Sequence, residues 1–217
     1  DFILQPKGIG SVLAQLPDSA TAGGNKRGTN AVDFSTYRTA ATQVASGNFS
    51  VVSGGSRNTA SGLRAFVGAG SVNVASNTGS VVCGGASNTN STNGGFLGGG
   101  QGNVVSAAYF ATIAGGHGNT ASGEYSSVLG GRYATTRGKY GMSAIASGQF
   151  GTQGDAQRGQ YILRGLTTDA TAKVLTADQA AAGTTNQCIL PNNSNYTIRG
   201  MVSSHRTDVI GTGAGWT

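Results

Sequence analysis

The sequence predicts an all-β protein: a parallel β-roll, or β-solenoid, followed by a small antiparallel, β-sandwich-like domain. Three observations support this fold class. A short motif recurs six times between Ser46 and Arg137. The chain holds 38 glycines among 217 residues, a content that disfavours helices. Its apolar residues follow the period of the motif and not the 3.6-residue period of a helix.

Each copy of the motif contains an apolar residue, a small residue, a glycine pair or its equivalent, usually an asparagine, then threonine or valine, then serine. The first member of the pair falls at Gly54, Ala69, Gly84, Gly99, Gly115 and Gly130. The intervals are 15, 15, 15, 16 and 15 residues, which is typical of stacked equivalent coils. Parallel strands stacked about 4.7–4.9 Å apart bring equivalent residues of neighbouring coils into contact.

Two columns of the motif are the candidate structural core. Two residues before the pair, every copy is apolar: Val52, Val67, Val82, Leu97, Ile113 and Val128. Five residues after its first member, every copy is β-branched: Thr59, Val74, Thr89, Val104, Thr120 and Thr135. β-Branched residues suit pleated strands, and Gly and Asn suit the corners. Because Thr alternates with Val, we expect the second column to point inward too, which argues against a flat outward Thr surface that binds ice.

The predicted roll is thin, because a coil of about 15 residues holds only two short strands and two turns. Its interior then contains one apolar residue and a few Ser, Thr and Ala side chains per strand. Such a core is too small to offset the entropy lost on ordering a glycine-rich chain. Copies of the same chain around a symmetry axis are the simplest source of more apolar surface, so the sequence predicts a homo-oligomer.

Three copies of the motif carry a family resemblance. "SVVSGGSRNTASG" (Ser50 to Gly62), "SVVCGGASNTNS" (Ser80 to Ser91) and "TIAGGHGNTASG" (Thr112 to Gly123) resemble the YadA-like head repeats of trimeric autotransporter adhesins. They resemble still more the related repeats of bacteriophage tail fibres and spikes. The resemblance covers roughly Asn30 to Phe150, although the adhesin repeat is usually one residue shorter. It implies a trimeric, left-handed parallel β-roll.

The chain divides into four predicted regions: lead-in strands or linker (1–29), the β-roll (30–150), a neck or linker (151–160) and a C-terminal β-rich tip domain (161–217). Within the roll, Ser35 to Gly47 aligns with Ser50 to Gly62 as a degenerate first coil. The fifth copy takes one extra residue near Tyr109 and Phe110, which indicates a bulge or a longer corner. The neck, Gly151 to Gln160, is polar, glycine-rich and aperiodic.

The tip region contains four apolar segments separated by turn signals, which favour antiparallel strands. They are "YILRGLT", "AKVLTAD", "NQCILPNNS" and "YTIRGMVSSHR". This arrangement resembles a module at the C-terminal end of phage tail fibres. Four strands make a meagre sandwich, so either more residues follow Thr217 or three chains complete one another. The chain starts with Asp1 rather than Met, so it reads as a fragment.

The sequence offers no constellation for catalysis, and we expect no enzyme activity, cofactor or metal. Between Gly47 and Phe150, Glu124 is the only acidic residue, whereas a glycosidase needs two opposed carboxylates. The two histidines, His117 and His205, are far apart, and three copies of either around an axis are the only route to an ion. Cys83 stands in a column of small residues, so we expect a buried thiol without a disulfide.

The net charge of +6 comes from dispersed basic residues, which does not favour nucleic-acid binding. No apolar run is long enough to insert into a membrane. Aromatic residues gather near the ends of predicted strands, and we expect them to pack between subunits more readily than to bind sugar rings. They are Phe49, Phe66, Phe96, Tyr109, Phe110, Tyr125, Tyr133 and Tyr140.

The leading hypothesis is therefore a structural and attachment protein: a homotrimeric segment of an extracellular phage tail fibre or spike in the virion. Its partners would be itself, upstream fibre or baseplate segments, and a polysaccharide or protein receptor on the host surface. The alternative is the head of a bacterial trimeric autotransporter adhesin. A third hypothesis is a polysaccharide-degrading tailspike that uses symmetric copies of Glu124.

Overall fold

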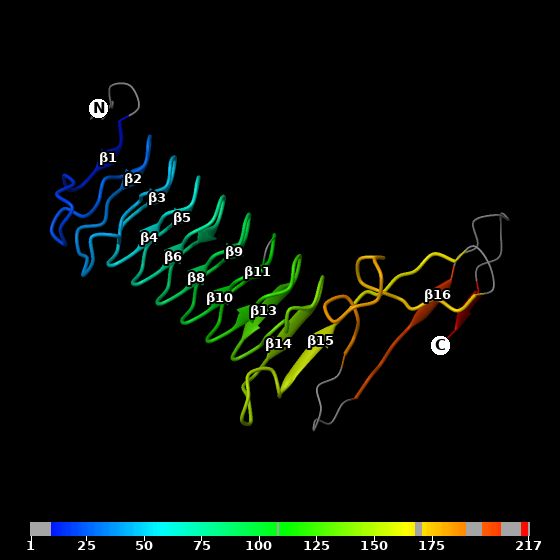
Figure 1. Ribbon diagram of the computed structural model, residues 1–217. Helices are drawn as coiled ribbons and strands as arrows, with labels where there is room; N and C mark the ends of the chain where they lie inside the picture. Colours follow the sequence, from blue (N-terminus) through cyan, green and yellow to red (C-terminus); the bar gives the residue numbers. More distant parts are fainter. Residues whose placement is uncertain (1–9, 108, 168–170, 190–196, 205–213, 217) are drawn as a thin grey trace.

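The computed structural model describes residues 10–107, 109–167, 171–189, 197–204 and 214–216. These residues confirm an all-β chain without helices. They form a parallel β-solenoid of about eight coils of roughly 15 residues. Figure 1 shows the coils stacked into a straight rod, with an arm of the chain extending from its C-terminal end.

One side of the rod is a ten-stranded sheet that takes one strand from each coil. Its order is β1-β2-β3-β5-β7-β9-β11-β13-β14-β15, and every pair except β14–β15 is parallel. The strands are β1 (Val12–Leu13), β2 (Val32–Asp33), β3 (Val51–Val52), β5 (Phe66–Val67), β7 (Val81–Val82), β9 (Phe96–Leu97), β11 (Thr112–Ile113), β13 (Ser127–Gly131), β14 (Ser143–Ala146) and β15 (Gln157–Gln160).

A second, five-stranded parallel sheet forms another side of the rod, in the order β12-β10-β8-β6-β4. Its strands are β4 (Thr59–Ala60), β6 (Val74–Ala75), β8 (Thr89–Asn90), β10 (Val104–Val105) and β12 (Thr120–Ala121). Single parallel bridges join neighbouring coils between the two sheets, for example Ser56 with Ser71 and His117 with Arg132. Each coil thus contributes two strands and one bridging residue.

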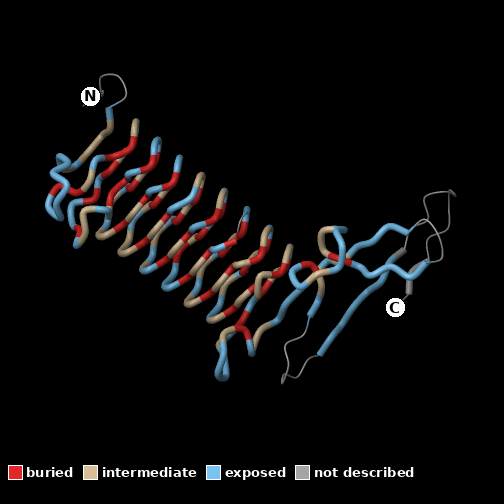
Figure 2. Tube along the Cα trace, in the orientation of Figure 1, coloured by how far each residue is buried: buried red, intermediate tan, exposed pale blue. Residues whose placement is uncertain are grey.

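The core is a narrow line of side chains inside the rod, seen as the red stretches of each coil in Figure 2. From the ten-stranded sheet, Val52, Val67, Val82, Leu97, Ile113 and Val128 are all at most 1% exposed. From the five-stranded sheet, the inward residues are Ala60, Ala75, Asn90, Val105 and Ala121, each 0% exposed. The inner faces of the two sheets therefore meet across a thin layer, to which each strand contributes one inward side chain.

The second predicted core column lies one residue away from the core. Thr59, Val74, Thr89, Val104 and Thr120 are only half-buried and lie on the outer face of the five-stranded sheet. Successive residues of a strand point to opposite faces, so the next residue in each coil points inward. The inward residues range in size from Ala60 to Val105, so size alone does not select this column. The sequence argument against an outward Thr column was therefore wrong.

A column of buried asparagines, and not of apolar residues, fills one corner of the rod. Asn58, Asn73, Asn88, Asn103 and Asn119 are fully buried. Each Nδ2 donates to a carbonyl of its own coil and to one of the next coil, as Asn88 does to Gly84 (2.9 Å) and Gly100 (2.9 Å). Each Oδ1 accepts from the backbone N–H of the next residue in the column or, at the last step, of Ala134. The asparagine column thus supplies hydrogen-bond partners for buried backbone groups that are not paired between strands.

The second glycine of each pair sits where no side chain fits. Gly55 has a φ of 77°, and a Cβ there would lie 2.1 Å from the carbonyl oxygen of Gly70 in the next coil. The equivalent Gly85 has a φ of 84° and the same close approach to Gly100. Both the left-handed backbone and the contact between coils require glycine here, which explains why this half of the pair never varies in the six copies.

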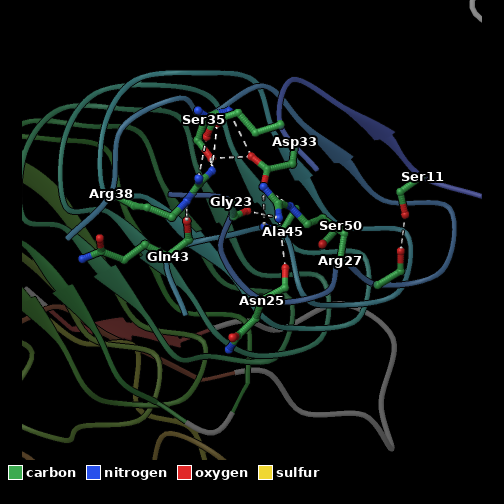
Figure 3. Close-up of polar contacts among 12 residues, drawn as sticks. Ser11, Gly23, Asn25, Arg27, Asp33, Ser35, Arg38, Gln43, Ala45 and Ser50 are labelled. Carbon is green, nitrogen blue, oxygen red and sulfur yellow. Dashed lines mark hydrogen bonds and ion pairs between the residues drawn. The ribbon is translucent and has the colours of Figure 1, made fainter. Parts of the chain in front are cut away.

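A buried ionic cluster closes the N-terminal end of the solenoid (Figure 3). Arg27 Nε donates to Asp33 Oδ2 at 2.6 Å, with side chains 1% and 0% exposed. Asp33 Oδ1 accepts from the Ser35 N–H, and Arg38 binds the Ser35 and Ala22 carbonyls. The charges cover the end of the apolar core, where the next coil is missing. The lead-in is thus part of the solenoid.

The first coil is longer than its predicted alignment. The strand at Val32 pairs with Val51, and Tyr37 pairs with Ser56, both with an offset of 19 residues. Alignment of Ser35 with Ser50 therefore misplaced this strand by four residues. The additional residues form the corner around Gln43, whose side chain accepts hydrogen bonds from the Thr39 and Ala40 N–H groups.

Replacement of Asp33 by Ala should destabilise the N-terminal coils. It leaves the Arg27 guanidinium buried without its counter-charge, a change that typically costs about 3–5 kcal/mol. Hydrogen exchange should show faster opening of β2 and β3, while β9 and β11 stay protected. Asp18→Ala, in an exposed turn, is the matched control and should leave exchange in β2 unchanged. Equal protection in Asp33→Ala and the wild type would contradict a closing role for the cluster.

The predicted neck, residues 151–160, closes the C-terminal end instead of linking domains. Residues Gln157–Gln160 form β15, which pairs antiparallel with β14. Gln153 Nε2 donates to the Gly118 and Ala134 carbonyls, and Gln157 bonds both the N–H and the carbonyl of Thr135. These two amides substitute for a further strand at the edge of the five-stranded sheet. Sequence periodicity could not reveal them, because they are side-chain contacts.

The C-terminal arm shows antiparallel pairing but not two packed sheets in its described residues. Arg164 bridges Thr176, and β16 (Val202–Ser204) pairs with β17 (Ala214–Trp216). The arm meets the last coil where the Tyr140 N–H donates to the Thr185 carbonyl and Lys139 Nζ donates to that of Thr184. Most of its large apolar residues are exposed, including Ile162 (77%) and Met201 (87%). Residues 190–194 of the third predicted strand and the two ends of the fourth lie outside the described residues, and β16 lies within the fourth.

Candidate interaction surface

The outer face of the ten-stranded sheet is the most distinctive surface of the rod. Its first outward column, set by the strand register, is Val32, Val51, Phe66, Val81, Phe96, Thr112, Ser127 and Ser143. The second column, two residues later, is Phe34, Ser53, Gly68, Cys83, Gly98, Ala114, Leu129 and Ile145. No residue in either column is charged, over eight consecutive strands.

Large apolar side chains on this face are open to solvent in a single chain. Phe34 is 44% exposed, Phe96 41%, Leu129 63% and Ile145 44%. The Phe96 ring leans over Gly98, where an added Cβ would lie 3.4 Å from its Cε1, and the Phe66 ring covers Gly68 in the same way. Aromatic rings thus alternate with glycine gaps on a flat sheet, a surface that favours packing against another apolar surface.

Cys83 lies on this face and is exposed, which corrects the prediction of a buried thiol. Its neighbour Val82 is the inward residue, so Cys83 points outward by the alternation of the strand. Cys188, in the arm, is also free and exposed. The expectation that the two cysteines do not form a disulfide with each other is consistent with both thiols being free.

One edge of the ten-stranded sheet carries a row of aromatic rings at the corners that precede the strands. The ring centroids of Phe110 and Tyr125 are 5.8 Å apart, those of Tyr125 and Tyr140 5.2 Å, and those of Tyr109 and Phe110 6.2 Å. We name this row, with Glu124, the aromatic edge. Phe110 and Tyr125 stack with their planes 29° apart, so each covers a face of the other. A sugar ring stacks on a free aromatic face, so this arrangement favours protein packing over sugar binding.

The opposite edge, at the corners that follow the strands, is basic and polar. Arg132 Cζ lies 4.8 Å from the centroid of the Tyr133 ring, and His117 contacts the same ring edge-on at 5.3 Å. The cation–π contact holds the guanidinium beside the sheet. We name these residues, with Arg57 and Gln101 in the same two columns, the basic edge.

The outer face of the five-stranded sheet differs from that of the ten-stranded sheet. It carries the half-buried Thr and Val column and, two residues later, a serine column: Ser61, Ser76, Ser91, Ser106 and Ser122. Its side chains are small, and most of them carry a hydroxyl group. Such a surface is well solvated and does not require a protein partner.

The structure brings together no catalytic or metal-binding group in its described part. Among those residues, no three His, Cys, Asp or Glu side chains gather where an ion would bind. Glu124 lies at the aromatic edge with no second carboxylate beside it, since the nearby groups of its row are Tyr109, Tyr125 and Tyr140. His117 contacts Tyr133, and His205 lies outside the described residues. The basic residues of the rod are spread over different corners, without a continuous basic groove.

No match to this chain was found among protein-family models, curated proteins or solved structures. Among the described residues, no helix is long and apolar enough to cross a membrane. The interpretation of function therefore depends on the geometry of the rod and its surfaces.

Proposed function

We propose that this chain is a structural and attachment protein: a homotrimeric segment of a phage tail fibre or spike that projects toward the host cell surface. The observation that supports this most directly is the uncharged outer face of eight consecutive strands of the ten-stranded sheet, β2 to β14, with its exposed apolar side chains. A monomer would expose rings such as Phe96 and Phe34 along the whole rod. Association through this face buries them and supplies the apolar area that the thin core lacks.

A rod built in this way suits a mechanical role. Each coil contacts its neighbours through backbone hydrogen bonds of both sheets and through the buried asparagine column. Three parallel rods around one axis would make a stiff fibre that presents three identical tips. Multivalency would then turn weak contacts with a surface polysaccharide or protein into firm adhesion. The same repeats would serve an adhesin head, and the segments that flank the rod distinguish the two.

The mass in solution tests this proposal. Light scattering should give about three times 21.5 kDa, and the oligomer should resist SDS without boiling. A folded monomer with the circular dichroism of a β-rod would overturn it, because the apolar face would then have no partner. Reducing ends released from capsule polysaccharide, and lost in Glu124→Gln, would instead support a depolymerase.

Cys83 provides an internal probe of which face associates. If three copies of the ten-stranded sheet surround one axis, their Cys83 thiols lie near one another, and mild oxidation should join chains in the Cys188→Ser variant. The matched control, Cys83→Ser with Cys188 retained, should not crosslink through the rod. A trimer whose Cys83 thiols all react freely with a bulky maleimide would place another face at the interface.

A further inference from the structure

We propose that neighbouring chains in the oligomer meet edge to edge, with the aromatic edge of one chain packed against the basic edge of the next. This inference rests on the proposed self-association and names the seam through which it occurs. The seam would be heterologous: each chain uses two different surfaces, and the contact repeats until the ring closes. Glu124 and Arg132 would form an ion pair across it.

The geometry of a rotating arrangement dictates which edges meet. The strands of the ten-stranded sheet run across the rod, so each has a corner before it and a corner after it. If the ten-stranded sheet of every chain faces one symmetry axis parallel to the rods, equivalent strands of all chains run around that axis in the same sense. The corner before a strand in one chain then lies beside the corner after the equivalent strand in its neighbour, at the same height.

At every level of the rod, two residues stand at each of these corners. By the strand register, the facing sets are Asn48 and Phe49 with Ser56 and Arg57, Leu63 and Arg64 with Ser71 and Val72, Thr78 and Gly79 with Ala86 and Ser87, Asn93 and Gly94 with Gln101 and Gly102, Tyr109 and Phe110 with His117 and Gly118, and Glu124 and Tyr125 with Arg132 and Tyr133. The largest side chains of both edges gather at the last two levels, and all four residues of the third level are small. No level places two like charges together.

The sixth level carries the strongest complementarity. Glu124 and Arg132 flank the same strand, β13, on opposite edges, so they stand at one height but cannot reach each other within a chain. In the described part of the chain, neither side chain has an ion-pair partner, and the Arg27–Asp33 pair is at the other end of the rod. The exposed guanidinium of Arg132 and the only carboxylate of the aromatic edge would satisfy each other across the seam.

Backbone strain at the same levels is an independent observation. Phe49, Arg64, Phe110 and Tyr125 adopt φ of 57°, 56°, 50° and 55° at a corner where Gly79 and Gly94 adopt the same conformation freely. On the basic edge, Arg57, Val72, Ser87 and Tyr133 have φ of 56°, 60°, 56° and 60° in the column where Gly102 and Gly118 stand in two further coils. Phe49, Phe110 and Tyr125 remain about half-exposed in the single chain. A contact with a neighbouring chain would compensate for placing large rings at strained positions.

A covalent-ring experiment tests the seam. In a Cys83→Ser, Cys188→Ser background, Glu124→Cys and Arg132→Cys are introduced together, and the oligomer is treated with a short bis-maleimide. After boiling in SDS, which separates chains that are not covalently joined, gels should show a covalent trimer without a ladder of larger species. Each single-cysteine variant should stay monomeric on the same gel, because equivalent positions do not face each other in a heterologous ring. Crosslinking by either single variant would overturn the inference.

Charge reversal provides a second test that does not depend on crosslinker reach. Glu124→Arg places two guanidinium groups at every seam and should lower the SDS resistance of the oligomer. The double variant Glu124→Arg, Arg132→Glu restores opposite charges in swapped positions and should recover it. Ser76→Arg, on the outer face of the five-stranded sheet, is the matched control for added charge. Unchanged SDS resistance in Glu124→Arg, or SDS resistance that stays low in the double variant, would contradict the ion pair.

These outcomes separate the inference from the proposed function. A trimer by light scattering that gives no covalent trimer would refute the seam and leave the fibre proposal standing. A folded monomer would refute both. A covalent dimer as the largest species would keep the edge-to-edge contact but replace the three-fold ring by a two-fold one, which contradicts the fibre proposal alone.

Discussion

Val82→Asp should abolish the folded rod at 25 °C. Val82 lies in the middle of the core column and is 0% exposed, with Val67 and Leu97 above and below it. The substitution removes a buried apolar side chain and places a carboxylate in a layer without a cation. Together these effects should cost about 5 kcal/mol or more, comparable to the whole stability of many domains. Loss of the β-signal in circular dichroism, or a large fall in Tm, checks this.

Ser76→Asp is the matched control for Val82→Asp. It adds the same charge to the same solenoid, but on the solvated outer face of the five-stranded sheet. Its melting temperature should stay within a few degrees of the wild type, as for most surface substitutions. A Val82→Asp protein that melts like Ser76→Asp would mean that the valine column is not the core.

Asn88→Ala should destabilise the whole rod, although it removes only a polar amide. The change leaves the Gly84 carbonyl and the Asn103 N–H without their partners inside the rod. Buried unpaired backbone groups each cost about 1–3 kcal/mol, so we expect a loss of about 3 kcal/mol in the free energy of unfolding. Urea denaturation followed by circular dichroism measures it.

Asn77→Ala tests whether burial, and not amide chemistry alone, causes that loss. Asn77 stands at an exposed corner of the neighbouring coil, where its Nδ2 donates to the Ser91 carbonyl at 3.2 Å. Water can replace that bond, so we expect a change of less than about 1 kcal/mol. A larger loss for Asn77→Ala than for Asn88→Ala would refute the role assigned to the asparagine column.

The sequence predicted the solenoid because period and polarity agree in every coil. The column through Val82 contains only aliphatic residues, and no other column of the motif combines that property with large size. The column through Thr59 was misplaced because periodicity alone cannot tell which of two adjacent regular columns points inward. The structure decides this: Ala60, Ala75, Asn90 and Val105 line the interior, and the column through Thr59 lies on the outer face.

The two ends of the rod were harder to predict than its middle. A sequence repeat reveals the residues that all coils share, whereas the residues that cover an end of the rod have no equivalents in other coils. Arg27, Asp33 and Gln153 occur once each and have no equivalents from which a pattern could be derived. The aromatic and basic edges posed a similar problem, because their residues differ from coil to coil. Only the strand register shows that Glu124 and Arg132 share one level.

The side-chain amides of Gln153 and Gln157 oppose the end-to-end stacking of one rod on another. A stack of parallel strands is a natural template for another copy, and its growth end to end is the geometry of amyloid. Here the edge of the five-stranded sheet is already hydrogen-bonded by glutamine side chains, and β15 ends the other sheet with reversed polarity and the exposed Arg158. Growth from the C-terminal end of the rod is therefore hindered, whereas sideways contact of the flat face stays open for assembly.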